Sequence, residues 1–154
     1  HLWVLHHGLW GDETHLDYVI EHIQRKASER GERIEILNIA ASRQGTWTYA
    51  GLDGCGAKVV HLVGRRVADC GRGAVCQVSF VGYSLGGLVL RYAIGVLFAQ
   101  RAFFQRAKPR WFVTFASPHI GAVRRSSENA VLAALVPLGS VLVARTGAQV
   151  LLRD

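Results

Sequence analysis

The sequence contains few of the residues that build disulfide frameworks or metal centres. Only three of its 154 residues are cysteine (Cys55, Cys70 and Cys76), and no two of them form a C-x-x-C pair. An odd number of cysteines without paired spacing argues against a disulfide framework and weakly favours a reducing compartment. Because no group of histidines comes with the carboxylates of a metal site, we expect no metal.

Long uninterrupted hydrophobic runs are also missing. The longest apolar stretch, residues 130–144, is broken by Pro137 and Gly139. A membrane-spanning helix needs about 20 predominantly apolar residues, so this stretch is too short to cross a bilayer. Two interpretations of residues 127–152 stay open: a lid over an acyl pocket or on a lipid surface, and an ordinary packing helix broken at Pro137, which is favoured slightly.

Acidic residues are scarce relative to basic ones. Eleven aspartates and glutamates face 18 lysines and arginines, which gives a formal net charge of +7. The basic residues are dispersed along the sequence, so a nucleic-acid partner is not expected. A solvated surface with surplus arginine is the favoured interpretation, and a surface that meets anionic lipid is the alternative. We expect an intracellular protein, either cytoplasmic or peripheral on a membrane or lipid droplet.

The pattern that is present is a regular alternation of strands and helices. Half of the residues are hydrophobic, and the length favours one domain over residues 1–154. A capping box at Thr14 and Asp17 is expected to start the first helix, Gly31 to end it, and Asp53 to cap the second. The alternation predicts an α/β fold, a parallel sheet with helices on both faces. The expected strands are 2–5, 33–39, 74–82 and 110–117, and the expected helices are 14–27, 53–67 and 85–100.

A serine lies where the third strand meets the third helix. The stretch Gly82-Tyr83-Ser84-Leu85-Gly86 is G-x-S-x-G, and its position between a β-branched strand and a long helix is typical of a nucleophile elbow. The turn is so tight that the residues two before and two after the serine must be very small. The alternative is a simple strand-to-helix turn without a catalytic role. We interpret Ser84 as the catalytic nucleophile, held in a strained backbone conformation with its hydroxyl exposed.

A nucleophile of this kind also needs donors for an oxyanion. One should be the backbone N–H of Leu85, directly after the serine, and the second should come from the loop after an earlier strand. The stretch HHGLWG (residues 6–11) is in that place. Gly8 permits the turn that aims the N–H of Leu9, with Trp10 as the reserve donor. His7 is interpreted as a loop residue that bonds backbone and does not touch substrate.

Five stretches of the sequence resemble one known family. They are HLWVLHHGLWG, GCGAKVVHLVGRRV, FVGYSLGGLVLRYAIG, FVTFASPHIG and RTGAQVLLRD. Together they resemble the "putative serine esterases", a lipase-like family of the α/β-hydrolase fold. The resemblance implies a partial α/β-hydrolase fold (the region of strands 3 to 6). It implies hydrolysis of a carboxylic ester, of lipid type, through an acyl-enzyme on Ser84 and without a cofactor. It also implies Leu9 and Leu85 as oxyanion donors. Residues expected to border the substrate are Gly8, Trp10, Tyr83 and His119.

The sequence does not supply the two partners of the serine in the order that this fold uses. After Ser84 the only histidine is His119, and it precedes the acids Glu128 and Asp154, whereas the fold requires acid before histidine. We therefore expect the chain to be an excerpt, with the triad acid and histidine beyond residue 154. Residues 1–154 alone should then be nearly inactive on esters. For His119, a loop-shaping role is favoured over one as base or cleft residue.

Two further functions remain open at this stage. An acyltransferase would use the same nucleophile but pass the acyl group to an alcohol instead of water. A remnant of the hydrolase fold would bind a lipid or a protein without catalysis, although such a remnant has no need of a strained serine between glycines. The sequence does not decide the acyl length or the headgroup.

Overall fold

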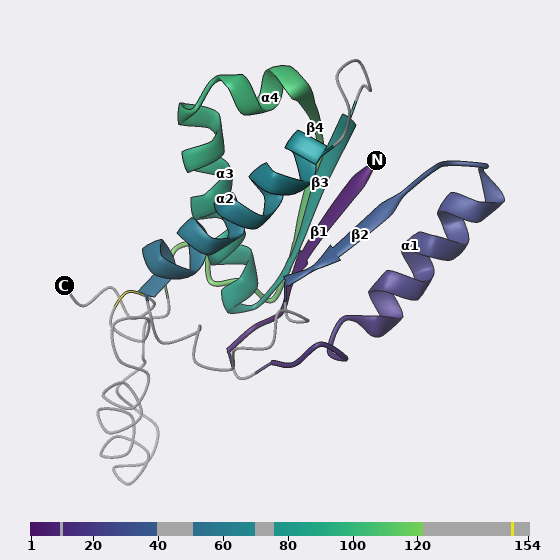
Figure 1. Cartoon of the computed structure of the whole chain (residues 1–154). Coiled ribbons are helices and arrows are strands. Elements are labelled where there is room, and N and C mark those ends of the chain that lie inside the picture. The colour runs from purple at the N-terminus through teal and green to yellow at the C-terminus, as the bar shows by residue number, and fades with distance from the viewer. Residues whose placement is uncertain (10, 40–50, 70–75, 122–148, 150–154) are drawn as a thin grey trace, which may run out of the picture.

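Four parallel strands form the sheet around which the chain is built (Figure 1). The structure, a computed structural model, describes residues 1–9, 11–39, 51–69, 76–121 and 149. Neighbouring strands follow the order β2-β1-β3-β4, and all three pairings are parallel. The strands are β1 (Leu2–His6), β2 (Glu35–Asn38), β3 (Cys76–Tyr83) and β4 (Ala107–Phe115).

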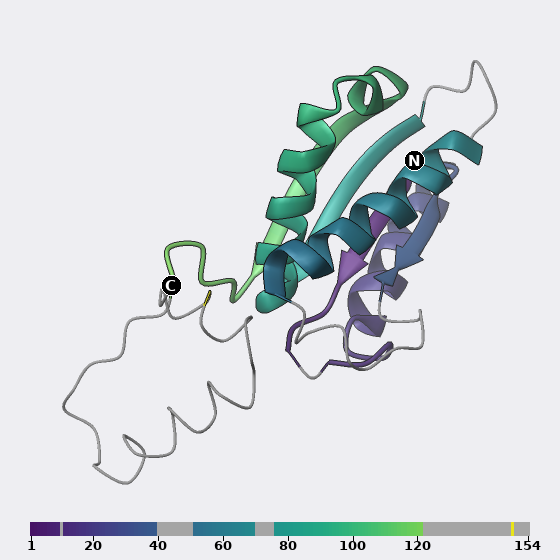
Figure 2. The same ribbon diagram turned by 60° about the vertical axis from the view of Figure 1, so that its left-hand side comes forward.

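Helices cover both faces of this sheet, as Figures 1 and 2 show. One helix, α1, lies on one face, while α2 and α3 lie together on the other. The predicted α/β fold, a parallel sheet between helices, is therefore confirmed. The four helices of the described residues are α1 (Asp17–Glu29), α2 (Gly51–Asp69), α3 (Leu85–Ala99) and the short α4 (Ala102–Arg106).

The strand that leads to Ser84 is the most deeply buried part of the sheet. Side chains alternate along a strand, so β3 sends Phe80 toward α2 and α3 and sends Val81 toward α1. Both are almost fully buried. Burial on both faces explains the continuous apolar run before the serine. The end of β3, which leads directly to Ser84, is thus held by a core on each face of the sheet.

A buried serine accommodates an irregularity between β3 and β4. Their pairing shifts register between Val78 and Phe80, so that β4 holds one residue more than β3 there. The side chain of Ser79, which is fully buried, lies at this point. Its Oγ accepts a hydrogen bond from the backbone N–H of Trp111 at 3.3 Å and bonds the Nε2 of His1 at 2.8 Å. The unpaired N–H of the bulge is satisfied by this hydroxyl.

Two predicted helix starts are wrong. Helix α1 begins at Asp17 after Leu16, and no side chain caps it. Thr14 instead takes part in a turn before the helix, where the carboxylate of Asp12 accepts bonds from its backbone N–H at 2.8 Å and its hydroxyl at 2.7 Å. The carboxylate of Asp12 thus binds the Thr14 groups that the predicted capping box would have used. Helix α2 begins at Gly51, so Asp53 lies within its first turn and not at the N-cap position. The predicted end of α1 is confirmed, since Gly31 follows it with a φ of 64°.

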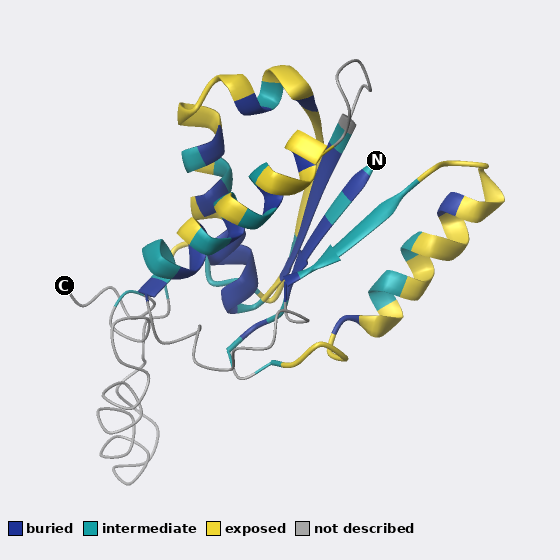
Figure 3. Ribbon diagram, in the orientation of Figure 1, coloured by how far each residue is buried: buried dark blue, intermediate teal, exposed yellow. Residues whose placement is uncertain are grey.

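The edge strand β4 is unusually apolar and exposed for its position (Figure 3). It begins at Ala107, three residues before the predicted start, because the unpredicted helix α4 turns the chain directly into it. Four of its large hydrophobic side chains are exposed: Trp111, Phe112, Val113 and Phe115. An exposed apolar sheet edge of this kind predicts low solubility of residues 1–154.

None of the helices in the described ranges is long and apolar enough to cross a membrane. Apart from Gln149, the segment 127–152, which we interpreted as a lid or a packing helix, lies outside the described residues.

Candidate active site

Ser84 occupies a strained turn at the carboxyl end of β3. Its φ is 52° and its ψ is −123°, a combination that a residue with a side chain rarely adopts. The residue lies directly before α3, in the N-cap position, and its side chain caps nothing. Its side chain is partly exposed, as expected for a nucleophile. The backbone geometry predicted for a nucleophile elbow is present.

Glycines on both sides of Ser84 make the turn possible. A Cβ added to Gly82 would lie 2.5 Å from both the backbone nitrogen and the Cα of Gly87. A Cβ added to Gly86 would collide with the backbone carbonyl oxygens of His6 and His7. The two motif glycines are thus required by different neighbours, one by the start of α3 and the other by the end of β1. The first turn of α3 consequently lies directly against the loop that follows β1.

The loop after β4 holds the elbow from a second side. The backbone N–H of Ser84 donates to the carbonyl oxygen of Phe115 at 2.8 Å. The hydroxyl of Ser117 donates to the carbonyl oxygen of Ser84, also at 2.8 Å. Sequence reasoning did not single out Ser117. The signal available was a small polar residue just past the carboxyl end of the strand that neighbours β3, where site residues of parallel sheets gather.

Replacing Ser117 with alanine should loosen the turn at Ser84 without removing the Ser84 hydroxyl. We expect the free energy of unfolding to fall by about 1 kcal/mol, the value of one hydrogen bond between neutral groups. Labelling of Ser84 by a fluorophosphonate in the full-length protein should become slower but should not stop. Labelling kinetics together with urea unfolding check both statements. An unchanged labelling rate would show that this bond does not position Ser84.

The loop that follows β1 passes directly beside the serine. A Cβ added to Gly8 would lie 2.9 Å from the Cβ of Ser84 and 3.4 Å from its Oγ. The same added atom would lie 3.4 Å from the ring of Tyr83, whose side chain is largely exposed. The structure therefore places Gly8, in the loop after β1, beside Tyr83 and Ser84 at the end of β3. Trp10, the reserve donor, lies outside the described residues.

Two backbone N–H groups near Ser84 are available to a ligand. Leu9 follows Gly8 in this loop, and Leu85 is the first residue of α3. Within the described ranges, neither N–H has a backbone or side-chain acceptor. Unpaired N–H groups at the start of a helix attract negative charge. Leu9 and Leu85 thus remain the candidate oxyanion donors.

The two histidines before Gly8 stiffen the loop. The Nδ1 of His7 bonds the carbonyl oxygen of Gly8 at 2.6 Å, which is the backbone bond predicted for His7. The Nδ1 of His6 bonds the carbonyl oxygen of His7 at 2.8 Å. Burial lowers the pKa of His6 to about 4, against a partly compensating hydrogen bond to His7. His6 is therefore neutral near pH 7 and donates a hydrogen bond to the loop beside Ser84. Sequence reasoning did not predict this role, because a buried histidine has no signature in sequence.

The buried His6 should make the fold sensitive to acid. Above pH 6.5 its imidazole is neutral in both the folded and the unfolded chain. As the pH falls from 6.5 toward about 4, the unfolded chain binds a proton that folded His6 does not. The free energy of unfolding should therefore fall by about 1.4 kcal/mol per pH unit, or about 3 kcal/mol in all.

Urea unfolding of the wild-type chain and of His6→Gln across this pH range measures the effect. Glutamine can still donate to the carbonyl oxygen of His7 but does not titrate. The wild type should lose more stability than the variant between pH 6.5 and 4. Equal losses in the two proteins would show that His6 is not the group responsible.

His119 is held by neighbours other than Ser84. Its Nε2 bonds the hydroxyl of Thr114 at 2.9 Å, and its carbonyl oxygen accepts a bond from Arg91, also at 2.9 Å. The favoured loop-shaping interpretation agrees with these bonds. The residue also lines a cavity of about 200 Å³ between α2, α3 and the loop after β4, so its place at the border of a substrate site stays a prediction. The other residues lining this cavity are Leu52, Leu88, Arg91, Tyr92, Pro118, Gly121 and Gln149.

No base contacts the serine in the described part of the chain. The hydroxyl of Ser84 forms no hydrogen bond with a described histidine, aspartate or glutamate. The prediction that the acid and the base come from beyond residue 154 therefore stays a prediction. The described ranges also hold no group of three or more histidine, cysteine, aspartate or glutamate side chains that could bind a metal ion.

Comparison with known proteins finds relatives in two yeasts and a similar solved structure. "Putative lipase ROG1" of Saccharomyces cerevisiae is 30% identical over 96% of this chain, and "Putative lipase C4A8.10" of Schizosaccharomyces pombe is 30% identical over 79%. This chain spans 21% and 16% of the lengths of those two relatives. Among solved structures, an extracellular alpha/beta-hydrolase from a Paenibacillus species matches with a TM-score of 0.47 at 15% identity, over 75% of this chain and 40% of that one.

A family model assigns the chain as a whole. The model described as "Putative serine esterase" matches residues 1–154 from end to end. Its match includes the elbow at Ser84 and the loops at Gly8 and Ser117. Together with the yeast relatives, this match shows that the chain belongs to the "putative serine esterase" family.

Proposed function

We propose that the protein is a serine hydrolase that cleaves carboxylic esters of lipids through an acyl-enzyme on Ser84. The observation that carries the proposal is the backbone of Ser84, strained at a φ of 52° with a hydroxyl that no described residue binds. Such strain persists only where the surrounding structure imposes it, and it is concentrated at functional sites. A serine that merely linked a strand to a helix would need neither the strain nor the crowded glycines.

The first chemical step follows from the groups around Ser84. Its Oγ attacks the carbonyl carbon of the ester, and the carbonyl oxygen takes up negative charge. The N–H groups of Leu9 and Leu85 are the proposed donors to that oxygen, each worth about 3 kcal/mol in the transition state. The hydroxyl proton passes to a base, which returns it to the departing alcohol. Water then cleaves the acyl-enzyme and releases the acid.

The lipid part of the proposal is supported by the relatives and by the exposed apolar surface. The yeast relatives named above carry the name lipase, which is said of them and is proposed for this protein. Beside the serine, Tyr83 and Phe115 are both exposed hydrophobic side chains, with 45% of each surface accessible. A long acyl chain can pack against these two side chains, whereas a small polar ester has too little apolar surface to do so.

Labelling with a fluorophosphonate probe tests the proposal in the full-length protein. Mass spectrometry should locate the phosphonyl group on Ser84 and on no other serine. Hydrolysis of p-nitrophenyl esters should increase as the acyl chain lengthens from acetate to decanoate. Labelling without any chain-length preference would support a serine hydrolase but reject the lipid assignment. Absence of labelling would reject the enzyme and favour a lipid- or protein-binding remnant.

A further inference from the structure

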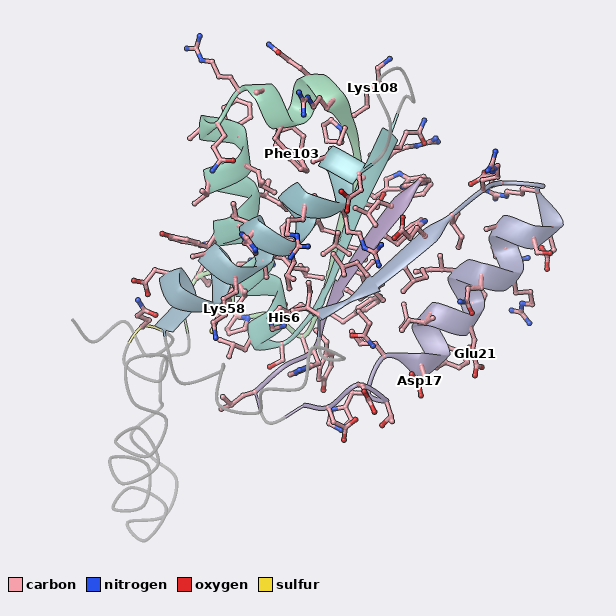
Figure 4. The ribbon with its side chains drawn as sticks, in the orientation of Figure 1. His6, Asp17, Glu21, Lys58, Phe103 and Lys108 are labelled. Atoms are coloured by element: carbon pink, nitrogen blue, oxygen red, sulfur yellow. The ribbon has the colours of Figure 1, made fainter. Side chains whose placement is uncertain are left out.

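A basic and aromatic surface lies at the end of the sheet opposite Ser84. It is formed by residues 98–111, which cover the last turn of α3, the short helix α4 and the start of β4. We call it the 98–111 surface. In Figure 4, Lys108 marks this end of the sheet and His6 marks the end that holds the elbow. Strand β4 joins the two ends, and its nine residues, Ala107–Phe115, separate them by about 26 Å.

The positive charge of the 98–111 surface is not neutralised locally. The segment contains no aspartate or glutamate. None of its basic side chains forms an ion pair with a described residue. Helix α2, which packs against α4, ends with the charged residues Arg65, Arg66 and Asp69, and Arg66 forms an ion pair with Glu35 at 3.0 Å. The exposed basic residues of the surface are Arg101, Arg106, Lys108 and Arg110.

Exposed aromatic side chains flank these charges. Phe98, near the end of α3, exposes 73% of its surface although most of that helix is buried. Trp111 exposes 46%, and the guanidinium carbon of Arg110 lies 4.9 Å from the centre of a Trp111 ring. An exposed phenylalanine gains nothing from water, whereas phenylalanine and tryptophan beside basic residues are typical of helices and loops that lie on anionic bilayers. Charge and aromatic exposure therefore point to the same partner.

We propose that the 98–111 surface docks the protein on an anionic lipid bilayer. The basic side chains attract the headgroups, and Phe98 enters the interface, while Trp111 lies further along β4 with its ring against Trp3 at 5.5 Å. Each basic residue close to such a surface strengthens binding about fivefold. Docked in this way, the protein would hold Ser84 about 26 Å from the bilayer, so this surface is a tether distinct from the mouth of the site. The proposal does not depend on the reaction of Ser84.

Co-sedimentation of the full-length protein with vesicles tests this proposal. All variants carry Ser84→Ala, so hydrolysis does not alter the lipids and failure of the proposed reaction cannot affect the result. The vesicles contain phosphatidylcholine alone or phosphatidylcholine with phosphatidylserine. The test variant is Arg101→Gln with Arg106→Gln. The matched control is Arg25→Gln with Lys26→Gln, which removes the same charge from exposed positions on α1, on the other face of the sheet.

The expected result is binding that requires phosphatidylserine and weakens as salt is raised. The test variant should bind about 25-fold more weakly, while the control should differ little from the parent. Phe98→Ser should weaken binding at least about tenfold through lost apolar contact. Circular dichroism confirms that each variant is folded. The proposal would be overturned if the parent did not bind vesicles, or if the test and control variants lost binding equally. It would also be overturned if the test variant bound as tightly as the parent. Binding to an RNA duplex is measured in parallel. If the parent bound RNA but not vesicles, and the test variant lost the RNA binding, the surface would be assigned to nucleic acid instead.

Discussion

Alanine in place of Ser84 should reduce kcat of the full-length protein on a p-nitrophenyl ester by about a millionfold, the loss seen when a serine triad loses its nucleophile. The structure gives the reason, because no other described hydroxyl combines a strained backbone, a partly exposed side chain and a neighbouring loop with unpaired N–H groups. Stability should change little or rise, since the variant keeps the same positive φ and only an unbonded hydroxyl is lost.

Ser28→Ala is the matched control for this measurement. Ser28 is exposed on α1 and far from the elbow in the structure, so its variant should keep full activity. Initial rates of the three proteins at saturating ester decide the outcome. Activity of Ser84→Ala within a hundredfold of the wild type would contradict the assignment of the nucleophile.

The same glycine-to-alanine change should have opposite effects at two positions of α3. At Gly86 the new Cβ meets the carbonyl oxygens of His6 and His7, which are backbone atoms and cannot rotate away. We expect a loss of about 3 kcal/mol in the free energy of unfolding, as for overpacking of a dense core. At Gly95 an added Cβ has open space around it, so Gly95→Ala should gain about 1 kcal/mol from helix propensity.

Urea unfolding of the two variants measures this difference directly. Because both changes are made in one helix, propensity is common to them and the gap of about 4 kcal/mol reports the crowding at the elbow. Gly86→Ala should also lose labelling of Ser84, while Gly95→Ala keeps it. If the two variants were equally stable, the close approach of α3 to the end of β1 would be wrong.

Much of the fold could be predicted because local patterns and the global fold agree. The buried runs before Gly8 and Ser84 predicted two parallel strands, and the helical spacing of Leu16, Val19 and Ile23 predicted a helix that packs on the sheet. The helix starts could not be predicted as reliably, because Asp12 competed for the groups that Thr14 was expected to use. Helix α4 escaped prediction since five residues give too few positions to show a helical period.

The candidate site was predictable where one short motif determines geometry. G-x-S-x-G predicted the strained turn at Ser84, the proposed nucleophile, since the glycines and the strain belong to the same turn. The support from Ser117 depends on a contact between residues 33 positions apart, and no periodicity reports such a pair. Likewise, the burial of His6 follows from the packing of α3 against the end of β1. These tertiary contacts require the folded chain.

The most direct test of the central claim is a crystal structure of the full-length protein with a phosphonate bound covalently to its serine. The structure presented here predicts phosphorus on the Oγ of Ser84 and one phosphonyl oxygen about 2.7–3.1 Å from the backbone nitrogens of both Leu9 and Leu85. A phosphonyl oxygen that points away from these two nitrogens, or an adduct on another residue, would contradict the account.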